Sequence, residues 1–402
     1  MKIILLTDGI YPYVMGGMQK HSYYLTKYLA KNRVEVELYH CVANDKSLVE
    51  ELEGFTKEEL NFINHHCFHF PKLDSFPGHY LRENRRLSEL YLEHYAIRTT
   101  DSSTSQSSAQ NDVFSSYIYV QGFTGRAFID AKQKGIELPD IIVNFHGLEM
   151  FQKAPSFRVK LEHLLLRKAV KYNVQNADNA VSLGGRLTAV LNNIKAKNVV
   201  EIPIGIEENW LVKTNEGSKK NIIKFVFIGR YERRKGIEEL SEVISDLNNE
   251  ISPLRNSSGR NDVIEFHFIG PIPNKFKVQS SKFKVVYHGE LREEEAIKEI
   301  LQGCDVLVSP SWSEGMPTVI LEAMASGCAI IATDVGAVSE QVDKSNGWLI
   351  EPGDKKQLKN VIIEAINTSQ VDLKQKKINS IERIKSKFLW NDVIKTTIHK
   401  LF

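Results

Sequence analysis

The sequence predicts an α/β protein made of two domains of similar size, each with a mainly parallel sheet. Short apolar runs bounded by Gly, Pro, Asp or Asn recur along the chain, and segments of helical period lie between many of them, which is typical of βα units. The pattern restarts after a polar stretch near the middle. In addition, 402 residues exceed what one hydrophobic core usually holds.

Twelve apolar runs are predicted to be strands. In the first half they lie at 3–7, 34–39, 117–121, 140–145, 179–183 and 199–204. In the second half they lie at 224–229, 265–270, 285–289, 305–310, 329–333 and 347–350. Polar residues 213–221 are predicted to join the halves, and 99–112 and 248–262 to be loops. The apolar period of 388–402, which includes Trp390, predicts a helix that needs a surface to pack against.

Composition excludes several classes of protein. The formal net charge is +2, with acidic and basic residues balanced along the chain, so nucleic acid is not an expected partner. The four cysteines form no C-x-x-C pair, which disfavours structural zinc and a disulfide scaffold. The opening apolar run is too short for a signal peptide, and no later run approaches a membrane span. We therefore expect a cytoplasmic protein with reduced thiols.

The most informative segment is SPSWSEGMPTVILEAMASG at 309–327. Its pattern predicts a helix over 317–326 that follows a buried strand and a Gly-containing turn. The first amides of that helix, at Met316 to Thr318, form a predicted anion site. Glu314 in the turn and Glu322 in the helix can accept hydrogen bonds from sugar or ribose hydroxyls. The alternative is that Glu314 caps the helix and Glu322 is solvated.

A second segment, FIGRYERRKG at 227–236, places Arg230 after a strand and Lys235 before the next helix, beside Gly229 and Gly236. An arginine fork and a lysine charge can hold a diphosphate and offset the charge that develops when it departs. Surface ion pairing is the alternative. The neighbouring Arg233 and Arg234 are expected to be solvated as readily as functional.

Two weaker signals lie in the first half. Gly16 and Gly17 precede a helical stretch, so their amides can approach a phosphate or a sugar. His146 ends a predicted strand in NFHGLEMF, where a structural histidine is the alternative. The glycines do not form G-x-G-x-x-G and no acidic residue is placed to bind a dinucleotide ribose, which disfavours a dehydrogenase.

Several signatures are absent from the chain. There is no D-x-D, H-E-x-x-H, G-x-S-x-G or G-x-x-x-x-G-K-[ST] motif, so a divalent ion, a serine hydrolase and a P-loop NTPase lack support. We expect no metal and no cofactor, and predict that Arg and Lys supply the positive charge near any phosphate.

Together these segments resemble the retaining GT-B glycosyltransferases of glycosyltransferase family 4 (glycosyl transferases group 1). The resemblance rests on GR-x4-KG at 229–236, on the E-x7-E pair within 309–327, and on Gly336 and Glu340 in DVGAVSE. The Gly16-Gly17 pair and HG-x-E at 146–149 add to it. It implies two Rossmann-like domains facing across a cleft, at about 1–205 and 206–383, with 384–402 crossing back to the first.

The resemblance also implies roles. Arg230 and Lys235 would grip the donor diphosphate, Glu322 the ribose, and Glu314 the transferred sugar. The Gly229 turn, the amides of Gly315, Met316 and Thr318, and Pro317 at the helix start would form the donor site, with Gly16 and Gly17 closing over it and His146 contacting the sugar near the reacting carbon. Met316 replaces a more usual Phe, and GPIP at 270–273 lacks a second Gly, which leaves the base pocket undefined.

The implied reaction is metal-independent transfer of a hexose from a nucleotide diphosphate sugar to an acceptor hydroxyl with retention. The acceptor would be a glycan, a glycolipid or another polysaccharide precursor. A GT-B epimerase and an inactive nucleotide-sugar-binding module are the alternatives. The helical segment 81–98 carries Arg82, Arg85 and Arg86 beside an apolar stripe, which suggests a reversible contact with the anionic inner leaflet of the membrane; a helix packed on its own sheet is the other interpretation.

Overall fold

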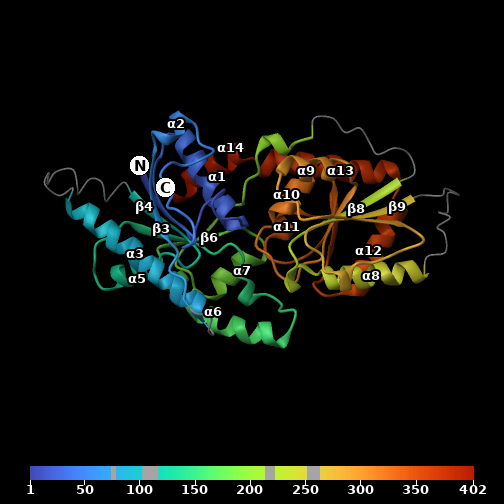
Figure 1. Ribbon diagram of the computed structural model, residues 1–402, viewed down its shortest axis with the longest axis horizontal. Helices are drawn as coiled ribbons and strands as arrows, with labels where there is room; N and C mark the ends of the chain where they lie inside the picture. The colour runs from blue at the N-terminus through green and yellow to red at the C-terminus, as the bar shows by residue number, and fades with distance from the viewer. Residues whose placement is uncertain (74–77, 102–115, 213–221, 251–262) are drawn as a thin grey trace. The chain divides into compact units, whose positions relative to one another are not determined.

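The computed structural model describes residues 1–73, 78–101, 116–212, 222–250 and 263–402. The predicted junction at 213–221 lies outside the described residues, as do most of the predicted loops at 99–112 and 248–262. The described chain divides into two compact units (Figure 1). Unit 1 comprises residues 1–146, 161–203 and 390–402, and unit 2 comprises 147–160 and 204–389.

Unit 1 contains a parallel sheet of seven strands in the order β3-β2-β1-β4-β5-β6-β7. The strands are β1 (Lys2–Leu6), β2 (Glu35–Val42), β3 (Ile63–His69), β4 (Ser116–Gln121), β5 (Asp140–Asn144), β6 (Asn179–Ser182) and β7 (Val199–Glu201). The helices are α1 (Gly17–Lys31), α2 (Lys57–Leu60), α3 (His79–Asp101), α5 (Arg126–Gln133), α6 (Phe157–Asn176, which begins in unit 2), α7 (Arg186–Asn193) and α14 (Trp390–Leu401).

Strand β1 shows why the apolar runs form this sheet. Ile3 and Leu5 pack in a core with residues of α1 and α14, while Ile4 and Leu6, on the opposite face, are equally buried. A strand covered on both faces by helices must be apolar at every position. Strand β3 was not predicted because its sequence, INHHCFH, carries three histidines and lies at the sheet edge with most side chains only partly buried.

The C-terminal helix α14 belongs to unit 1. Trp390 is fully buried and its ring stacks on Tyr28 of α1, with the centroids 5.6 Å apart. The predicted apolar helix and its return to the first domain are therefore present. The chain re-enters unit 1 at Trp390 rather than at 384, because residues 384–389 remain with unit 2.

Unit 2 contains a six-stranded parallel sheet in the order β10-β9-β8-β11-β12-β13. Its strands are β8 (Ile222–Ile228), β9 (Val263–Ile269), β10 (Lys284–Gly289), β11 (Val306–Ser309), β12 (Ala329–Thr333) and β13 (Gly347–Ile350). Its helices are α8 (Ile237–Glu250), α9 (Glu294–Gln302), α10 (Thr318–Ala325), α11 (Val338–Gln341), α12 (Lys355–Asn367) and α13 (Gln370–Lys387). Helices α8 and α12 cover one face of the sheet, and α9, α10 and α13 cover the other (Figure 1).

The apolar stripe of segment 81–98 is not free to meet a membrane. Leu87 and Tyr91 of α3 are fully buried, and the Tyr91 hydroxyl donates a hydrogen bond to the carbonyl of Thr7 at 2.8 Å. Arg85 and Arg86 both form ion pairs with Glu89. The apolar stripe of this helix therefore packs on its own unit, as the other interpretation of the segment expects. No helix among the described residues is both long and apolar enough to cross a bilayer.

Candidate active site

The candidate site in unit 2 lies where the strand order of its sheet reverses, between β8 and β11. Strands β8 and β11 are neighbours, but the chain leaves β8 toward β9 on one side and continues from β11 toward β12 on the other. Loops at the carboxyl ends of two such strands separate and leave a crevice, where ligands bind in open α/β sheets. The two predicted motifs, 229–236 and 309–317, follow β8 and β11.

Glycines bring these two loops into direct backbone contact. A β-carbon at Gly236 would lie 2.0 Å from the carbonyl oxygen of Pro310, and φ is +71° there. A third loop, after β12, also touches the site: at Gly336, where φ is +55°, a β-carbon would lie 2.2 Å from the carbonyl oxygen of Glu314. The Trp312 amide also donates to the carbonyl of Arg234 at 2.6 Å. Larger residues at either glycine would push the loops apart.

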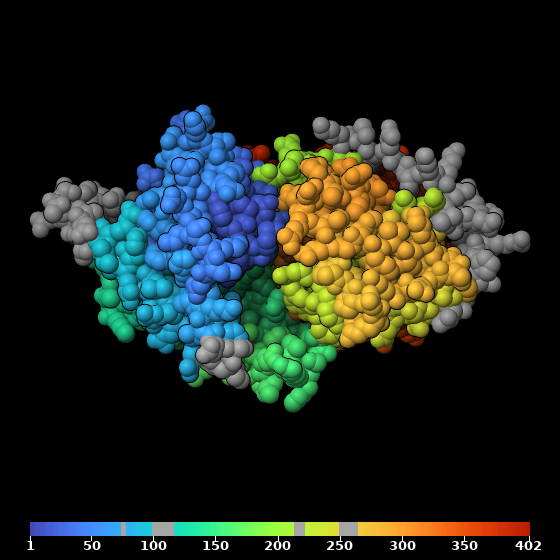
Figure 2. Space-filling model, in the orientation of Figure 1, coloured from blue at the N-terminus to red at the C-terminus, as the bar shows by residue number. Residues whose placement is uncertain are grey.

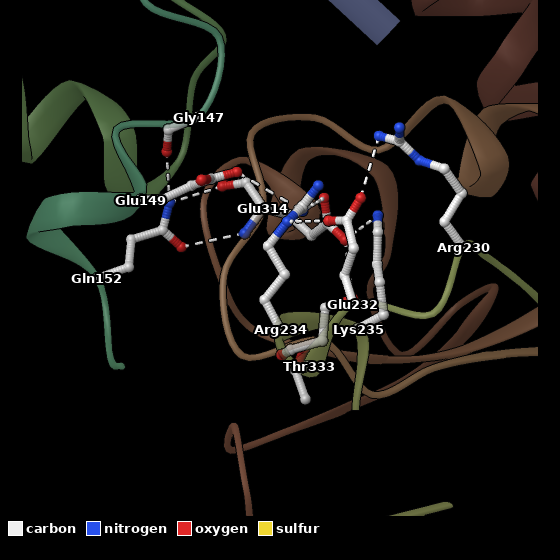
Figure 3. Close-up of polar contacts among 10 residues, drawn as sticks. Gly147, Glu149, Gln152, Arg230, Glu232, Arg234, Lys235, Glu314 and Thr333 are labelled. Atoms are coloured by element: carbon white, nitrogen blue, oxygen red, sulfur yellow. Dashed lines mark hydrogen bonds and ion pairs between the residues drawn. The ribbon is translucent and has the colours of Figure 1, made fainter. Parts of the chain in front are cut away.

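Glu314 is the centre of the site (Figure 3). Its carboxylate is buried, and its Oε1 accepts hydrogen bonds from Lys235 Nζ at 2.7 Å and from Ser311 Oγ at 2.8 Å. Its Oε2 accepts from Arg234 Nη1 at 3.3 Å. Lys235 and Glu314, which were predicted in separate motifs, therefore meet in space, although they lie in loops that follow different strands.

Two opposing effects set the pKa of Glu314. Burial raises the pKa, but the positive charges of Lys235 and Arg234 and the hydrogen bonds from Lys235 and Ser311 outweigh burial and hold the pKa below its ordinary value. Glu314 is thus ionised at neutral pH. A carboxylate kept ionised in a buried position can accept hydrogen bonds from ligand hydroxyls.

Arg230 differs from Lys235 in its surroundings. Its side chain is 70% exposed, and its Nη2 lies 3.1 Å from the carboxylate of Glu232. Glu232 in turn accepts from Arg234 Nε at 2.7 Å. In Figure 3 Arg230 extends away from the Glu314 cluster, so its guanidinium can move to meet a ligand.

The sequence left open whether Arg233 and Arg234 are solvated or functional, and in the structure both form ion pairs. Arg234 contacts Glu314 and Glu232, as above, and its Nη1 lies 3.6 Å from Glu149 Oε1. Arg233 forms a two-pronged pair with Glu239, at 2.9 and 2.5 Å. Arg234 therefore belongs to the site, whereas Arg233 anchors the start of α8. Residues 233–235 form a short 3-10 turn, on which the two adjacent arginines point in different directions. The sequence alone does not show which arginine faces the site.

Residues 147–160 add contacts that sequence analysis missed. Gln152 Nε2 donates to the carbonyl of Glu314 at 2.6 Å and to that of Gly147 at 2.5 Å. Its Oε1 accepts from the Glu314 amide at 3.3 Å. Partial desolvation raises the pKa of Glu149, with Arg234 opposing this effect. The HG-x-E motif pointed to Glu149, but nothing in the sequence singled out Gln152.

The predicted anion site lies at the N-terminus of helix α10. Pro317 is its N-cap, and the helix starts at Thr318, one residue later than predicted. The first amides of a helix have no intrahelical partner and carry partial positive charge. Met316 is buried, with its sulfur 3.2 Å from the Ile204 amide, and Glu322 is partly buried in the second turn. Gly315 is partly exposed in the turn between Glu314 and Met316.

The predicted residues of unit 1 form a separate group. Gly16 is the N-cap of α1 and Gly17 its first residue, with nothing within 4 Å of a β-carbon built at Gly17. His146 follows β5, and its Nε2 lies 2.7 Å from Gln121 Oε1. Gln121 Nε2 lies 2.9 Å from Nδ1 of His21.

This buried chain of three side chains fixes the orientation of His146. Burial lowers the pKa of His146 to about 4, and burial together with the neighbouring His146 holds the pKa of His21 well below its ordinary value, so both rings are neutral at pH 7. Because Gln121 offers its oxygen to His146, that ring carries its proton on Nε2. His21 also packs 5.5 Å from the Trp390 ring. Sequence analysis missed His21 and Gln121, since neither lies in a motif.

The described residues contain no group of three or more His, Cys, Asp or Glu side chains placed to hold a metal ion. All four cysteines are free thiols.

Residues 223–368, within unit 2, match the family model described as Glycosyl transferases group 1. An uncharacterized glycosyltransferase of Methanocaldococcus jannaschii is 25% identical over 92% of this chain and 89% of its own. A Bacillus subtilis protein named as a teichuronic acid biosynthesis glycosyltransferase, TuaC, is 31% identical over 46% of each chain. The family match and these names support a glycosyl-transfer function.

Solved structures show that the fold is GT-B. The sucrose-phosphate synthase of Thermosynechococcus elongatus superimposes with a TM-score of 0.73 and 16% identity, covering 99% of this chain and 97% of that one. HepE of Anabaena, in complex with UDP, superimposes with a TM-score of 0.62 and 16% identity, covering 99% of both chains. The predicted pair of Rossmann-like domains is thereby confirmed.

Proposed function

We propose that this protein is a retaining glycosyltransferase that moves a hexose from a nucleotide diphosphate sugar to an acceptor hydroxyl. The observation that carries the proposal is the buried, ionised Glu314 held 2.7 Å from Lys235 beside the N-terminus of α10. Cationic groups and helix amides suit a diphosphate. The Glu314 carboxylate can accept hydrogen bonds from the hydroxyls of the sugar that is attached to this diphosphate.

In the proposed reaction the acceptor oxygen bonds to the anomeric carbon as the bond from that carbon to the diphosphate oxygen breaks. The leaving oxygen takes the acceptor proton, and attack occurs on the face the diphosphate leaves. Lys235, Arg230 and the amides of Gly315, Met316 and Thr318 offset the charge that grows on the diphosphate. Glu314 orients the sugar and Glu322 the ribose, while Gly229 shapes the turn that carries Arg230. The roles of Gly16, Gly17 and His146 remain predictions.

Metal independence is part of the proposal, because Arg230, Arg234 and Lys235 already place three cations in the loop between β8 and α8. The acceptor is proposed to be a glycan, a glycolipid or another precursor of a surface polysaccharide. TuaC, named for teichuronic acid biosynthesis, motivates that choice. UDP in the HepE structure makes UDP-sugars the first donors to test.

Incubation with a panel of nucleotide diphosphate sugars and separate acceptors tests the function. Stability shifts first identify the bound donor, since a ligand at 100 times its dissociation constant adds about 2.7 kcal/mol. We then expect release of the nucleoside diphosphate and a glycoside whose anomeric configuration, read by proton NMR, matches the donor. An inverted product would contradict retention. Isomerised donor without transfer would indicate an epimerase, and tight binding without turnover an inactive binding module.

A further inference from the structure

Helix α6 presents an apolar stripe to the surface. Phe157, Leu161, Leu164 and Leu165 are 81%, 59%, 51% and 57% exposed. Their spacing of four, three and one residues places them on one side of the helix. The buried residues Val170, Asn173 and Val174 lie on the opposite side. In Figure 2 this part of the chain, in green, lies at the surface.

Such a stripe is unusual for a helix of a globular domain. Amphipathic helices normally turn their apolar side inward, as α3 does with Leu87 and Tyr91. Scattered exposed leucines need no explanation, but four large apolar side chains in a row mark an interaction surface. The question is which partner covers them.

The charges around the stripe favour an anionic partner. Helix α6 holds five Lys or Arg residues and one Glu, so its formal charge is 5 − 1 = +4. Lys160, Lys168 and Lys171 are exposed. On the helical wheel Lys160 lies at one edge of the apolar stripe, and Lys168 and Lys171 continue it one and two turns further on. A protein core would not accommodate lysines within such a stripe.

We propose that α6 is an interfacial helix that attaches the protein reversibly to an anionic lipid bilayer. The apolar side chains would enter the boundary between headgroups and acyl chains, and the lysines would meet the headgroup phosphates. A helix lying in the interface needs both features, because apolar insertion or charge attraction alone gives weak binding. Attachment would bring unit 1 to the surface on which a lipid-linked acceptor is found.

Vesicle co-sedimentation with the full chain tests the proposal, using phosphatidylcholine vesicles with and without about 30% phosphatidylserine, an anionic lipid that attracts basic segments. We expect binding only to the anionic vesicles, and less of it as salt rises. Changing Lys160, Lys168 and Lys171 together to Gln should weaken the apparent affinity about a hundredfold, since each basic residue contributes about fivefold.

The chain offers a matched control in α3. Changing Arg82, Arg85 and Arg86 to Gln removes the same amount of charge from a helix of unit 1 but leaves α6 intact, so it should leave most binding in place. Changing Leu161, Leu164 and Leu165 to Ser should reduce binding at least tenfold without changing net charge. These side chains are exposed, so unfolding curves of the variants should match that of the parent protein.

Several outcomes would overturn the proposal. One is that the α3 control loses as much binding as the α6 lysine variant. Another is that the protein does not pellet with anionic vesicles at low salt. The third is that the protein forms a dimer without lipid and that the change of Leu161, Leu164 and Leu165 to Ser dissociates this dimer. The last outcome would assign the stripe to a second copy of the chain. Vesicle binding is measured without donor or acceptor, so it succeeds or fails independently of the proposed transfer reaction.

Discussion

The contact between Lys235 and Glu314 gives the sharpest test of how the site is built. At 2.7 Å, with an effective dielectric constant of about 20, the attraction between the two charges is about 6 kcal/mol. Breaking a buried ion pair usually costs about 3–5 kcal/mol because one charge is left alone. Here Arg234 remains 3.3 Å from the same carboxylate and Ser311 still donates to it. We therefore expect Lys235→Met to lower the free energy of unfolding by only about 1–2 kcal/mol.

A double-mutant cycle measures this interaction. Lys235→Met, Glu314→Gln and the double variant would be unfolded in urea at pH 7.5, followed by tryptophan fluorescence. Two side chains in direct contact should show a coupling free energy of about 1–2 kcal/mol. Additivity within about 0.5 kcal/mol would refute the contact as a stabilising pair. The coupling should persist above the ordinary glutamate pKa and be lost as pH falls below it, because the folded-state pKa of Glu314 is lowered.

Turnover should behave differently from stability. In the proposed reaction Lys235 and Arg230 each offset charge on the leaving diphosphate, so replacing either should slow turnover by about 10²–10³-fold. Arg230 is 70% exposed and forms a surface pair with Glu232, so Arg230→Ala should cost at most about 1 kcal/mol of stability. Assays well below each variant's unfolding temperature separate the two effects. Wild-type turnover in either variant would remove that residue from the diphosphate site.

Further expectations follow from other side chains. Glu322→Ala should weaken binding of the free nucleoside diphosphate, measured by titration calorimetry, whereas Glu314→Ala should spare it and impair transfer; equal losses would contradict separate roles. Excess EDTA should leave most activity intact, and activity lost with EDTA and restored by Mg²⁺ or Mn²⁺ would overturn metal independence. Burial raises the pKa of Glu37, but hydrogen bonds from His66 and Lys2 outweigh burial and hold the pKa at about 2. The stabilisation by ionised Glu37 should therefore be present above about pH 4.5 and be lost as pH falls toward 2. The free energy of unfolding of Glu37→Gln should lack this loss between about pH 4.5 and 2. Burial raises the pKa of Asp8 to about 6, so ionisation of Asp8 should destabilise the fold as pH rises from about 4 through 6. The free energy of unfolding of Asp8→Asn, relative to that of the parent protein, should be about 1–3 kcal/mol higher at pH 8 than at pH 4. An equal difference at both pH values would contradict this.

The layout of the fold could be predicted from the sequence, and so could the two loops of unit 2 in which Lys235 and Glu314 meet. All twelve predicted strands exist, because strands covered on both faces must be apolar throughout, as β1 is at Ile3 to Leu6. The motifs that hold Lys235 and Glu314 were identifiable because glycines and a helix start mark loops at strand ends. Strand β3 escaped prediction, since an edge strand has weaker burial and tolerates its histidines.

Only the tertiary structure decided which side chains meet and which faces are covered. Arg233 and Arg234 are neighbours of identical chemistry, yet one anchors α8 and the other reaches Glu314. Helix α3 has an apolar stripe that its own unit buries, whereas α6 has one that remains exposed. The reason is physical: periodicity fixes how residues are arranged around a helix, but the rotation of that helix on the sheet depends on packing against segments distant in the chain.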